Sequence, residues 1–273
     1  MEITPPLFAV IAIIALLCEY VDASLGMGYG TALSPILLIM GFLPLQVVPS
    51  VLLGQVVGGL AGGFFHHRLG NISLDFRRDE AIKKRLRGLG YMPRSLDSKI
   101  IFILAICGFV GALAAVFFAL NIPTVALKTY IGIMVLGIGI VILIRRNRKS
   151  NLSWKGLVGI GLLSAFNKGA SGGGYGPLIT GGQIISGRET RSSIGSTTLA
   201  EGLVCIVAFV SYVVLKGDIY WRLAAATSIG SVVAAPLAAM TVKRIDSQRL
   251  KIVVGIATSL LGALTITKVF IRW

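Results

Sequence analysis

Residues that carry most enzyme chemistry are scarce in this sequence. Its 273 residues include only two histidines, three cysteines and eleven acidic residues. It contains no His-Glu-x-x-His motif, no Walker sequence and no cluster of acidic residues that could hold a metal ion. The sequence therefore favours neither a metalloenzyme nor an ATP-driven pump, and it predicts no catalytic residue, no cofactor and no metal site.

The three cysteines also lack a recognisable pattern. Cys18, Cys107 and Cys205 each lie within an apolar run, and they do not have the spacing of metal ligands. Packing as small apolar side chains is the role that we favour for each of them. They leave the redox compartment of the protein undetermined.

Apolar residues, by contrast, are abundant. They make up 55% of the chain, and the mean hydropathy of +0.86 exceeds what a soluble core of this size could bury. The runs that begin at Ile100 and Leu250 approach the roughly 20 residues that a helix needs to cross a bilayer. We therefore expect an all-α, multi-pass protein of the plasma or inner cell membrane.

The positive charge is concentrated in two loops. The net charge is +15, and the densest basic clusters lie within residues 66–88 and 145–149. Basic loops next to membrane helices normally stay in the cytoplasm, so both loops are predicted to be cytoplasmic. Aromatic residues are not interleaved with these basic residues, and topology already accounts for the charge, so no nucleic-acid partner is expected.

The chain contains an internal repeat. A shift of 146 positions aligns a series of identical residues, and further along a shift of 122 gives the best match, where Gly108 meets Gly230. The difference predicts an insertion of 24 residues around Asp75 to Asp97 in the first copy. The aligned pairs are Gly26/Gly172, Gly28/Gly174, Tyr29/Tyr175, Gly30/Gly176, Gly41/Gly187 and Ser50/Ser196. We expect two homologous repeats, residues 1–150 with a basic cytoplasmic insertion near 68–98 and residues 151–273; chance similarity of glycine-rich sequences is the alternative.

Each repeat is expected to contain about five apolar segments. In the first repeat they cover residues 7–21, 31–42, 47–65, 100–120 and 125–144. The first two flank a glycine-rich turn, and their length of about 18–22 Å is less than the ~30 Å hydrocarbon core, so broken or re-entrant helices are expected. The three longer segments make the number of crossings odd, which inverts the second repeat. If each short pair formed one broken crossing, the repeats would instead be parallel.

The glycine-rich turns, GMGYG at residues 26–30 and GGGYG at residues 172–176, form the candidate substrate site. Paired, glycine-interrupted segments in two halves of a chain indicate the binding site of a transporter near the bilayer midplane. Glycine lets the backbone approach a ligand closely, and the helix after each turn points free N–H groups and its positive end at an anion. Close helix packing is the alternative role for these glycines.

Polar residues inside apolar segments complete the candidate site. Under the 146-residue shift Glu201 aligns with Gln55 and Asp22 aligns with Lys168, and ionisable residues at membrane depth are costly enough to suggest a function. Glu201 and Asp22 are the proton-coupling candidates; the alternatives are a Glu201 carboxyl satisfied by nearby hydroxyls and an ion pair between Asp22 and Lys168. The candidate substrate-binding residues are Gly28, Tyr29, Gly30, Thr31, Ser50, Gln55, Lys168, Gly174, Tyr175, Gly176, Ser196 and Thr197.

Five short motifs extend over nearly the whole chain. They read LGMGYGTALSP at 25–35, SGGGYGP at 171–177, VPSVLLGQ at 48–55, GSTTLAEG at 195–202 and GDIYWRLA at 217–224. Together they resemble the sulfite exporter TauE/SafE family of membrane permeases. The resemblance implies export or exchange of small sulfur-containing anions such as sulfite or organosulfonates. Two departures, a methionine within the first glycine run and the long basic insertion, leave the transported compound open.

Two other functions compete for parts of these motifs. GASGG at residues 169–173 resembles the nucleophile motif of rhomboid intramembrane proteases, but a serine nucleophile needs a base, and His66 and His67 lie in the other half of the sequence. The GYG sequences resemble potassium-channel filters, but Lys168 lies close by and the repeat is twofold. We therefore predict a permease, not an enzyme, that moves a small anion by alternating access within the lipid bilayer, with association into a homodimer left open.

Overall fold

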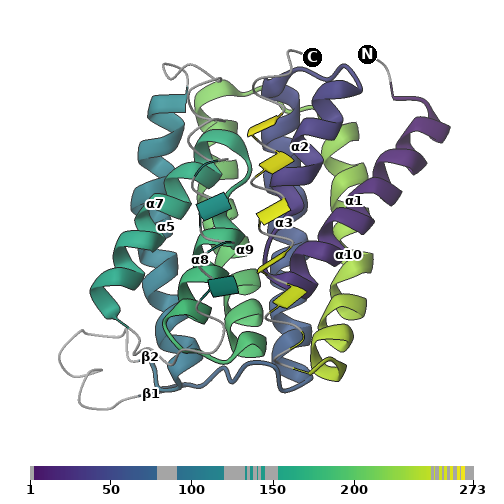
Figure 1. Ribbon diagram of the computed structural model, residues 1–273. Coiled ribbons are helices and arrows are strands. Elements are labelled where there is room, and N and C mark those ends of the chain that lie inside the picture. The colour runs from purple at the N-terminus through teal and green to yellow at the C-terminus, as the bar shows by residue number, and fades with distance from the viewer. Residues whose placement is uncertain are drawn as a thin grey trace.

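The computed structural model describes residues 3–78, 91–119 and 153–246, together with single helical positions within 133–144 and 249–267. These residues form a bundle of long helices that lie side by side, with two shorter helices among them (Figure 1). The helices are α1 (Pro5–Leu25), α2 (Tyr29–Ile39), α3 (Pro44–Arg68), α5 (Leu96–Ala119), α7 (Trp154–Ser171), α8 (Tyr175–Ile185), α9 (Thr190–Lys216) and α10 (Trp221–Arg244).

Among the described residues, five helical segments are long and apolar enough to cross a membrane. Large apolar side chains such as Ile13, Phe109 and Val214 are exposed on three of them, as expected for helices in contact with lipid. The five segments are Pro5–Leu25, Leu45–Arg68, Leu96–Ala115, Thr190–Leu215 and Trp221–Arg244. The prediction of a multi-pass helical membrane protein is confirmed. The apolar segments expected at 125–144 and after Leu250 lie largely outside the described residues.

The helices that follow the two glycine turns are short, as predicted. α2 and α8 have 11 residues each, which corresponds to about 16 Å and is too short to cross a bilayer. The segment before the first turn is longer than predicted. α1 has 21 residues, because the helix begins at Pro5 and continues past Val21 through Asp22 and Ser24, whose polarity ended the apolar run in the sequence. It ends at Gly26, which has the left-handed backbone conformation.

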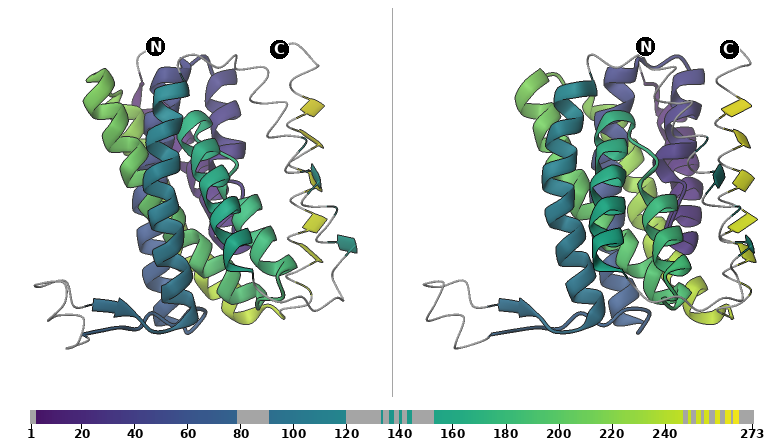
Figure 2. Two further views of the ribbon diagram at one scale, coloured as in Figure 1. Left: turned by 90° about the vertical axis from the view of Figure 1, so that its left-hand side faces the viewer. Right: turned by 60° about the vertical axis from the view of Figure 1, so that its left-hand side comes forward.

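The long helices pack in the order α7, α5, α9, α3, α10, α1, each against the next. Figure 2 shows this bundle from two further sides. Exchanging α1 with α7, α3 with α9 and α5 with α10 reproduces the same order in reverse. α1 therefore lies against α10, from the other end of the described chain, and α3 and α9 form the centre of the bundle.

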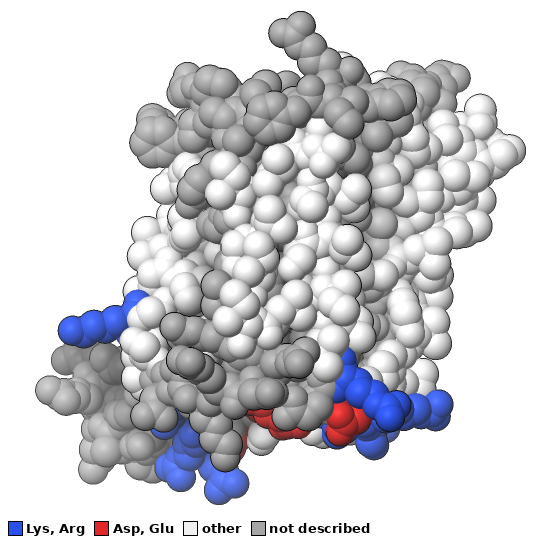
Figure 3. All heavy atoms as spheres, in the orientation of Figure 1, with Lys and Arg blue, Asp and Glu red and all other residues white. Residues whose placement is uncertain are grey.

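A small antiparallel ribbon lies in the predicted basic insertion. β1 (Phe76–Arg78) pairs with β2 (Tyr91–Pro93), with Phe76 opposite Pro93. The described structure is otherwise helical, as expected, and strands of three residues leave no alternation that a sequence pattern could reveal. The Lys and Arg side chains visible in Figure 3 gather at the end of the molecule that carries β1 and β2, which we call the basic end.

The two central helices, α3 and α9, run in opposite directions. At their crossing a Cβ atom on Gly59 would lie 2.8 Å from the Cα atom of Gly202. Further along α3, Gly62 contacts Thr198 and Gly63 contacts Leu199, so the residue numbers rise on one helix and fall on the other. Small residues at this crossing let the two backbones approach closely, as is common between membrane helices.

The outer helices run parallel to their neighbours, α7 beside α5 and α1 beside α10. Near the basic end the Ser73 amide donates to Asp97 Oδ2 at 2.7 Å, and Asn71 Nδ2 donates to the Ala239 carbonyl at 2.9 Å. α5 therefore begins at the basic end, and α10 ends there. The pairs that set the directions are Leu104/Gly161 and Ala115/Gly169 for α5 and α7, and Ala12/Gly230 and Tyr20/Thr241 for α1 and α10. As a result, α7 runs away from the basic end and α1 runs toward it.

Candidate functional site

The two glycine turns have the same kind of backbone conformation. Gly26 and Gly28 have φ values of 72° and 127°, and the aligned Gly172 and Gly174 have φ values of 74° and 78°. This left-handed region is open to glycine and strained for residues with a Cβ atom. The turn that ends one helix and begins the next therefore requires glycine at these positions in both copies.

The two turns touch each other through their backbones. A Cβ atom on Gly30 would lie 1.6 Å from the carbonyl oxygen of Gly172, and a Cβ atom on Gly176 would lie 2.4 Å from that of Gly26. The Gly174 amide also donates to Thr31 Oγ1 at 3.2 Å. The turns thus meet, and in this conformation backbone contact fills the space between them.

Two buried polar pairs lie at aligned positions close to the turns. Gln55 Nε2 donates to Asp22 Oδ2 at 2.9 Å, and Lys168 Nζ donates to Glu201 Oε1 at 2.6 Å. The alternative of an ion pair between Asp22 and Lys168 is wrong, because each bonds to the residue 33 positions later and their charges interact only at longer range. Lys168, rather than a group of hydroxyls, is the partner of Glu201.

The two turns differ in what lies at the start of the following helix. At the first turn the Tyr29 amide, which begins α2, donates to Asp22 Oδ1 at 3.1 Å. At the second turn α8 starts after Gly174, which provides no side-chain cap, and the residue aligned with Asp22 is Lys168. Helix N-termini attract anions through their free N–H groups and the helix dipole. The first turn therefore contains its own anion, whereas the second has a buried cation in the aligned place.

Comparison with known proteins connects this arrangement to a family. The family model for sulfite exporter TauE/SafE matches residues 86–265, more than half of the chain. The chain belongs to the sulfite exporter TauE/SafE family. The chain is also 27% identical over 271 residues to the probable membrane transporter protein YtnM of Bacillus subtilis (strain 168). This alignment covers 94% of this chain and 82% of the relative. This TauE/SafE protein is thus a membrane transporter and not an enzyme.

Membership of the TauE/SafE family does not favour the protease or the channel. His66, the buried one of the two histidines, lies on α3 with Nε2 3.1 Å from the Ala23 carbonyl and Nδ1 3.0 Å from Asn71 Nδ2. Both ring nitrogens therefore hold structural contacts. Within the described ranges no group of three His, Cys, Asp or Glu residues is arranged to hold a metal ion.

Three of the predicted binding residues in the TauE/SafE chain pack against other helices. Tyr29 Oη donates to the Thr227 carbonyl at 3.4 Å, and the Ser50 carbonyl accepts a bond from Thr227 Oγ1 at 2.9 Å, so both lie against α10. Tyr175 is buried in an apolar cluster, where its hydroxyl has no hydrogen-bond partner among the described residues. The two buried tyrosines therefore anchor the starts of α2 and α8, whereas Thr31 lies on α2 and contacts the second turn.

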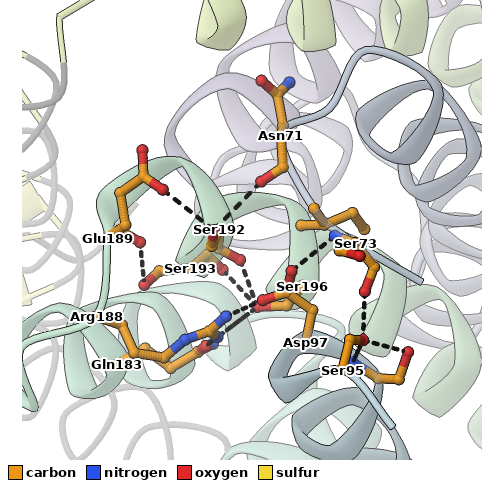
Figure 4. Close-up of polar contacts among 12 residues, drawn as sticks. Asn71, Ser73, Ser95, Asp97, Gln183, Arg188, Glu189, Ser192, Ser193 and Ser196 are labelled. Carbon is orange, nitrogen blue, oxygen red and sulfur yellow. Dashed lines mark hydrogen bonds and ion pairs between the residues drawn. The ribbon is translucent and has the colours of Figure 1, made fainter. Parts of the chain in front are cut away.

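A polar network that the sequence analysis missed lies at the basic end (Figure 4). Arg188, between α8 and α9, forms an ion pair with Asp97 at the start of α5 and donates to Gln183 and Ser196. Burial lowers the pKa of the Arg188 guanidinium, and the Asp97 carboxylate partly offsets this shift, so the group stays charged at neutral pH. Gln183 Nε2 also donates to Thr197 Oγ1 at 3.0 Å. The predicted residues Ser196 and Thr197 therefore belong to this network.

The sequence analysis also missed Glu19 on α1. Its side chain is fully buried, and neither carboxyl oxygen has a hydrogen-bond partner among the residues that the structure describes. It lies three positions before Asp22 at the end of an apolar run, in the same setting that singled out Glu201. The rule for ionisable residues at membrane depth would therefore have found it.

Proposed function

We propose that this TauE/SafE protein is a secondary transporter that moves small anions, sulfite or organosulfur anions, across the cell membrane by alternating access. The observation that carries the proposal is the difference between the turns: Asp22 lies at the start of α2, whereas Lys168 holds the aligned place before α8. A small anion would take at α8 the position that the Asp22 carboxylate takes at α2. Gly174 and Gly176 would give it access to backbone amides, and Lys168 would provide the positive charge.

Binding of the anion would compete with Glu201 for Lys168. An anion that takes over the Lys168 ammonium leaves the Glu201 carboxylate without its partner, at a buried place where an unpaired charge is costly. A proton on Glu201 would remove this cost. Glu201, together with Asp22, is therefore proposed to couple transport to protons.

Replacing Glu201 with Gln should weaken the dependence of transport on a pH gradient while anion binding remains measurable. Glutamine cannot titrate, and it is the native residue at the aligned position, Gln55. Sulfite uptake into proteoliposomes with and without an imposed pH gradient measures the effect. Asp218→Asn, which removes an exposed carboxylate, is the control. An undiminished response to the gradient in Glu201→Gln would rule out the coupling role.

The two parts of the chain, residues 1–150 and 151–273, are proposed to be inverted repeats. The antiparallel contact of α3 with α9 supports this arrangement, and so do the opposite directions of α1 and α7. In inverted repeats the two broken segments enter from opposite sides of the membrane and meet near its midplane. Alternating access then requires contacts that close the two ends in turn.

Two contacts, each made by the loop that follows a short helix, are proposed to close these ends. At the basic end Arg188 pairs with Asp97. The residue aligned with Arg188 is Phe42, which lies between α2 and α3 and packs on Tyr220 with 6.2 Å between ring centroids. One contact is ionic and the other is aromatic. Each joins the loop after a short helix to the start of a long helix from the other repeat.

Breaking the ionic contact should open the basic end. Asp97→Asn leaves the buried Arg188 charge without its counter-ion, which should weaken the closed state by about 3 kcal/mol. A cysteine placed at Thr197, in a background without the three native cysteines, should then react several-fold faster with a membrane-impermeant thiol reagent added at the basic side. Asp218→Asn in the same background is the matched control. An unchanged labelling rate in Asp97→Asn would mean that this ion pair does not close the path.

Transport assays with a panel of anions test the proposed substrate class. Purified protein in proteoliposomes is supplied with sulfite, sulfate, thiosulfate and organosulfonates, and the rate of uptake is measured for each. We expect sulfite or an organosulfonate to be transported fastest. A protein that is correctly inserted but moves none of these anions would contradict the proposal.

A further inference from the structure

Glu19 fills a space where three helices meet. It extends from α1 toward α3 and α10, where a Cβ atom on Gly58 would lie 2.7 Å from the Glu19 carboxyl carbon and 2.8 Å from Ser231 Cβ. The carboxyl is fully buried, and both of its oxygens lack hydrogen-bond partners among the described residues. The missing side chain at Gly58 is what gives the carboxyl its room.

The aligned place in the second half of the chain is filled with hydrocarbon. The shift of 146 positions aligns Glu19 with Ala165 and Gly58 with Val204, and both residues are fully buried in one apolar cluster. In the first half the larger side chain is at the first of these two positions (Glu19), and in the second half it is at the second position (Val204). Since alanine and valine fill such a place without polar atoms, packing alone does not require a carboxyl at position 19.

The groups that could stabilise a charge on Glu19 are engaged elsewhere. Lys168, the one cation near Glu19 among the described residues, is paired with Glu201. Asp22 has its own donors and adds a second negative charge nearby. The titratable groups that face Glu19 are Cys18, Asp22, Tyr29, Lys168, Glu201 and Cys205. An ionised Glu19 would therefore have neither a donor nor a counter-ion, which a low-dielectric interior strongly disfavours.

We infer that Glu19 is a proton-binding site, and that the anion binds to the form of the transporter in which Glu19 carries a proton. The proton comes from water when one end of the protein opens, converts the carboxylate to a neutral carboxylic acid, and returns to water when the other end opens. A neutral Glu19 lowers the negative charge near Lys168 and so favours an incoming anion. This coupling to the anion rests on the proposed function, whereas the protonation of Glu19 does not.

Infrared spectroscopy of the purified protein at neutral pH, without added anion, tests the proton site. The wild-type protein should show a carboxylic-acid C=O band that shifts in D2O and is lost in Glu19→Gln. The double variant Glu19→Ala/Gly58→Val copies the residue pair of the second half, so it should keep the fold and also lose the band. Glu201→Gln and Asp218→Asn should retain it, because both variants keep the Glu19 carboxyl. A wild-type spectrum without the band, or a band that persists in both Glu19 variants, would overturn the inference.

Two further measurements separate the alternatives. If a sodium ion neutralised Glu19 in place of a proton, NaCl but not KCl would raise the Tm of the wild type and not of Glu19→Gln, and this result would also overturn the inference. If sulfite is transported, its affinity should depend less on pH in Glu19→Gln than in the wild type, and an unchanged pH dependence would refute the coupling. If the wild type moves no anion while the infrared band behaves as expected, the proposed function fails and the proton site stands.

Discussion

Adding one methyl group at Gly30 is expected to abolish transport. The Cβ atom of an alanine would lie 1.6 Å from the carbonyl oxygen of Gly172, and no rotamer change can move either atom out of the way. An extra methylene in a packed core typically costs about 1–3 kcal/mol, and a clash with backbone at the contact of the two turns should cost more. Gly30→Ala should therefore either fail to fold or hold the turns apart, and transport is lost in both cases.

Gly159→Ala is the matched control for this substitution. Gly159 is exposed on α7, and a Cβ atom there would have nothing within 4 Å. Gly28→Val and Gly174→Val, at φ values of 127° and 78°, should also insert into the membrane and fail to transport. Yield of monodisperse protein and sulfite uptake are measured for all four variants. Normal transport by Gly30→Ala would show that the turns do not need their close contact.

Removing the charge of Lys168 is expected to cost both stability and anion affinity. Lys168→Met leaves the Glu201 carboxylate buried without its partner, and breaking a buried ion pair on one side costs about 3–5 kcal/mol. The double variant Lys168→Met/Glu201→Gln removes both charges and should recover most of this stability. Asp22→Asn should not rescue Lys168→Met, because Asp22 is bonded to Gln55 and to the Tyr29 amide.

Anion affinity distinguishes a structural ion pair from a substrate contact at Lys168. Thermal unfolding gives the stability of each variant, and calorimetry gives its affinity for sulfite. We expect the double variant to be stable but unable to bind sulfite, whereas Glu201→Gln alone still binds. Full affinity in the double variant would assign Lys168 to the structure only.

The repeat in the sequence predicted the local architecture well, because identical glycines at a fixed shift impose the same turn twice. The helices after these turns, Tyr29–Ile39 and Tyr175–Ile185, have equal lengths and aligned bounds. The full length of α1 was not predicted, because Asp22 and Ser24 end the apolar run although they continue the helix. The pairing of α1 with α10 was not predicted either, since an alignment of repeats does not say which helices are neighbours.

The candidate site was predicted in its residues more than in its contacts. The alignment of Asp22 with Lys168 suggested an ion pair between them, but aligned residues occupy equivalent places and need not touch. Arg188 gave no signal, because its aligned residue is Phe42 and its partner Asp97 lies in the insertion, where no repeat comparison applies. Glu19 aligns with Ala165, so a search for shared residues passed over it.

Exchange of labelled sulfite across proteoliposome membranes is the most direct test of an anion site at Lys168. The wild-type protein and Lys168→Met/Glu201→Gln are compared at equal amounts of inserted protein, after thermal unfolding has shown that their stabilities match. We predict rapid exchange by the wild type and, for the double variant, exchange no faster than in empty vesicles. Exchange at the wild-type rate by the double variant would contradict an anion site at Lys168 beside the second glycine turn.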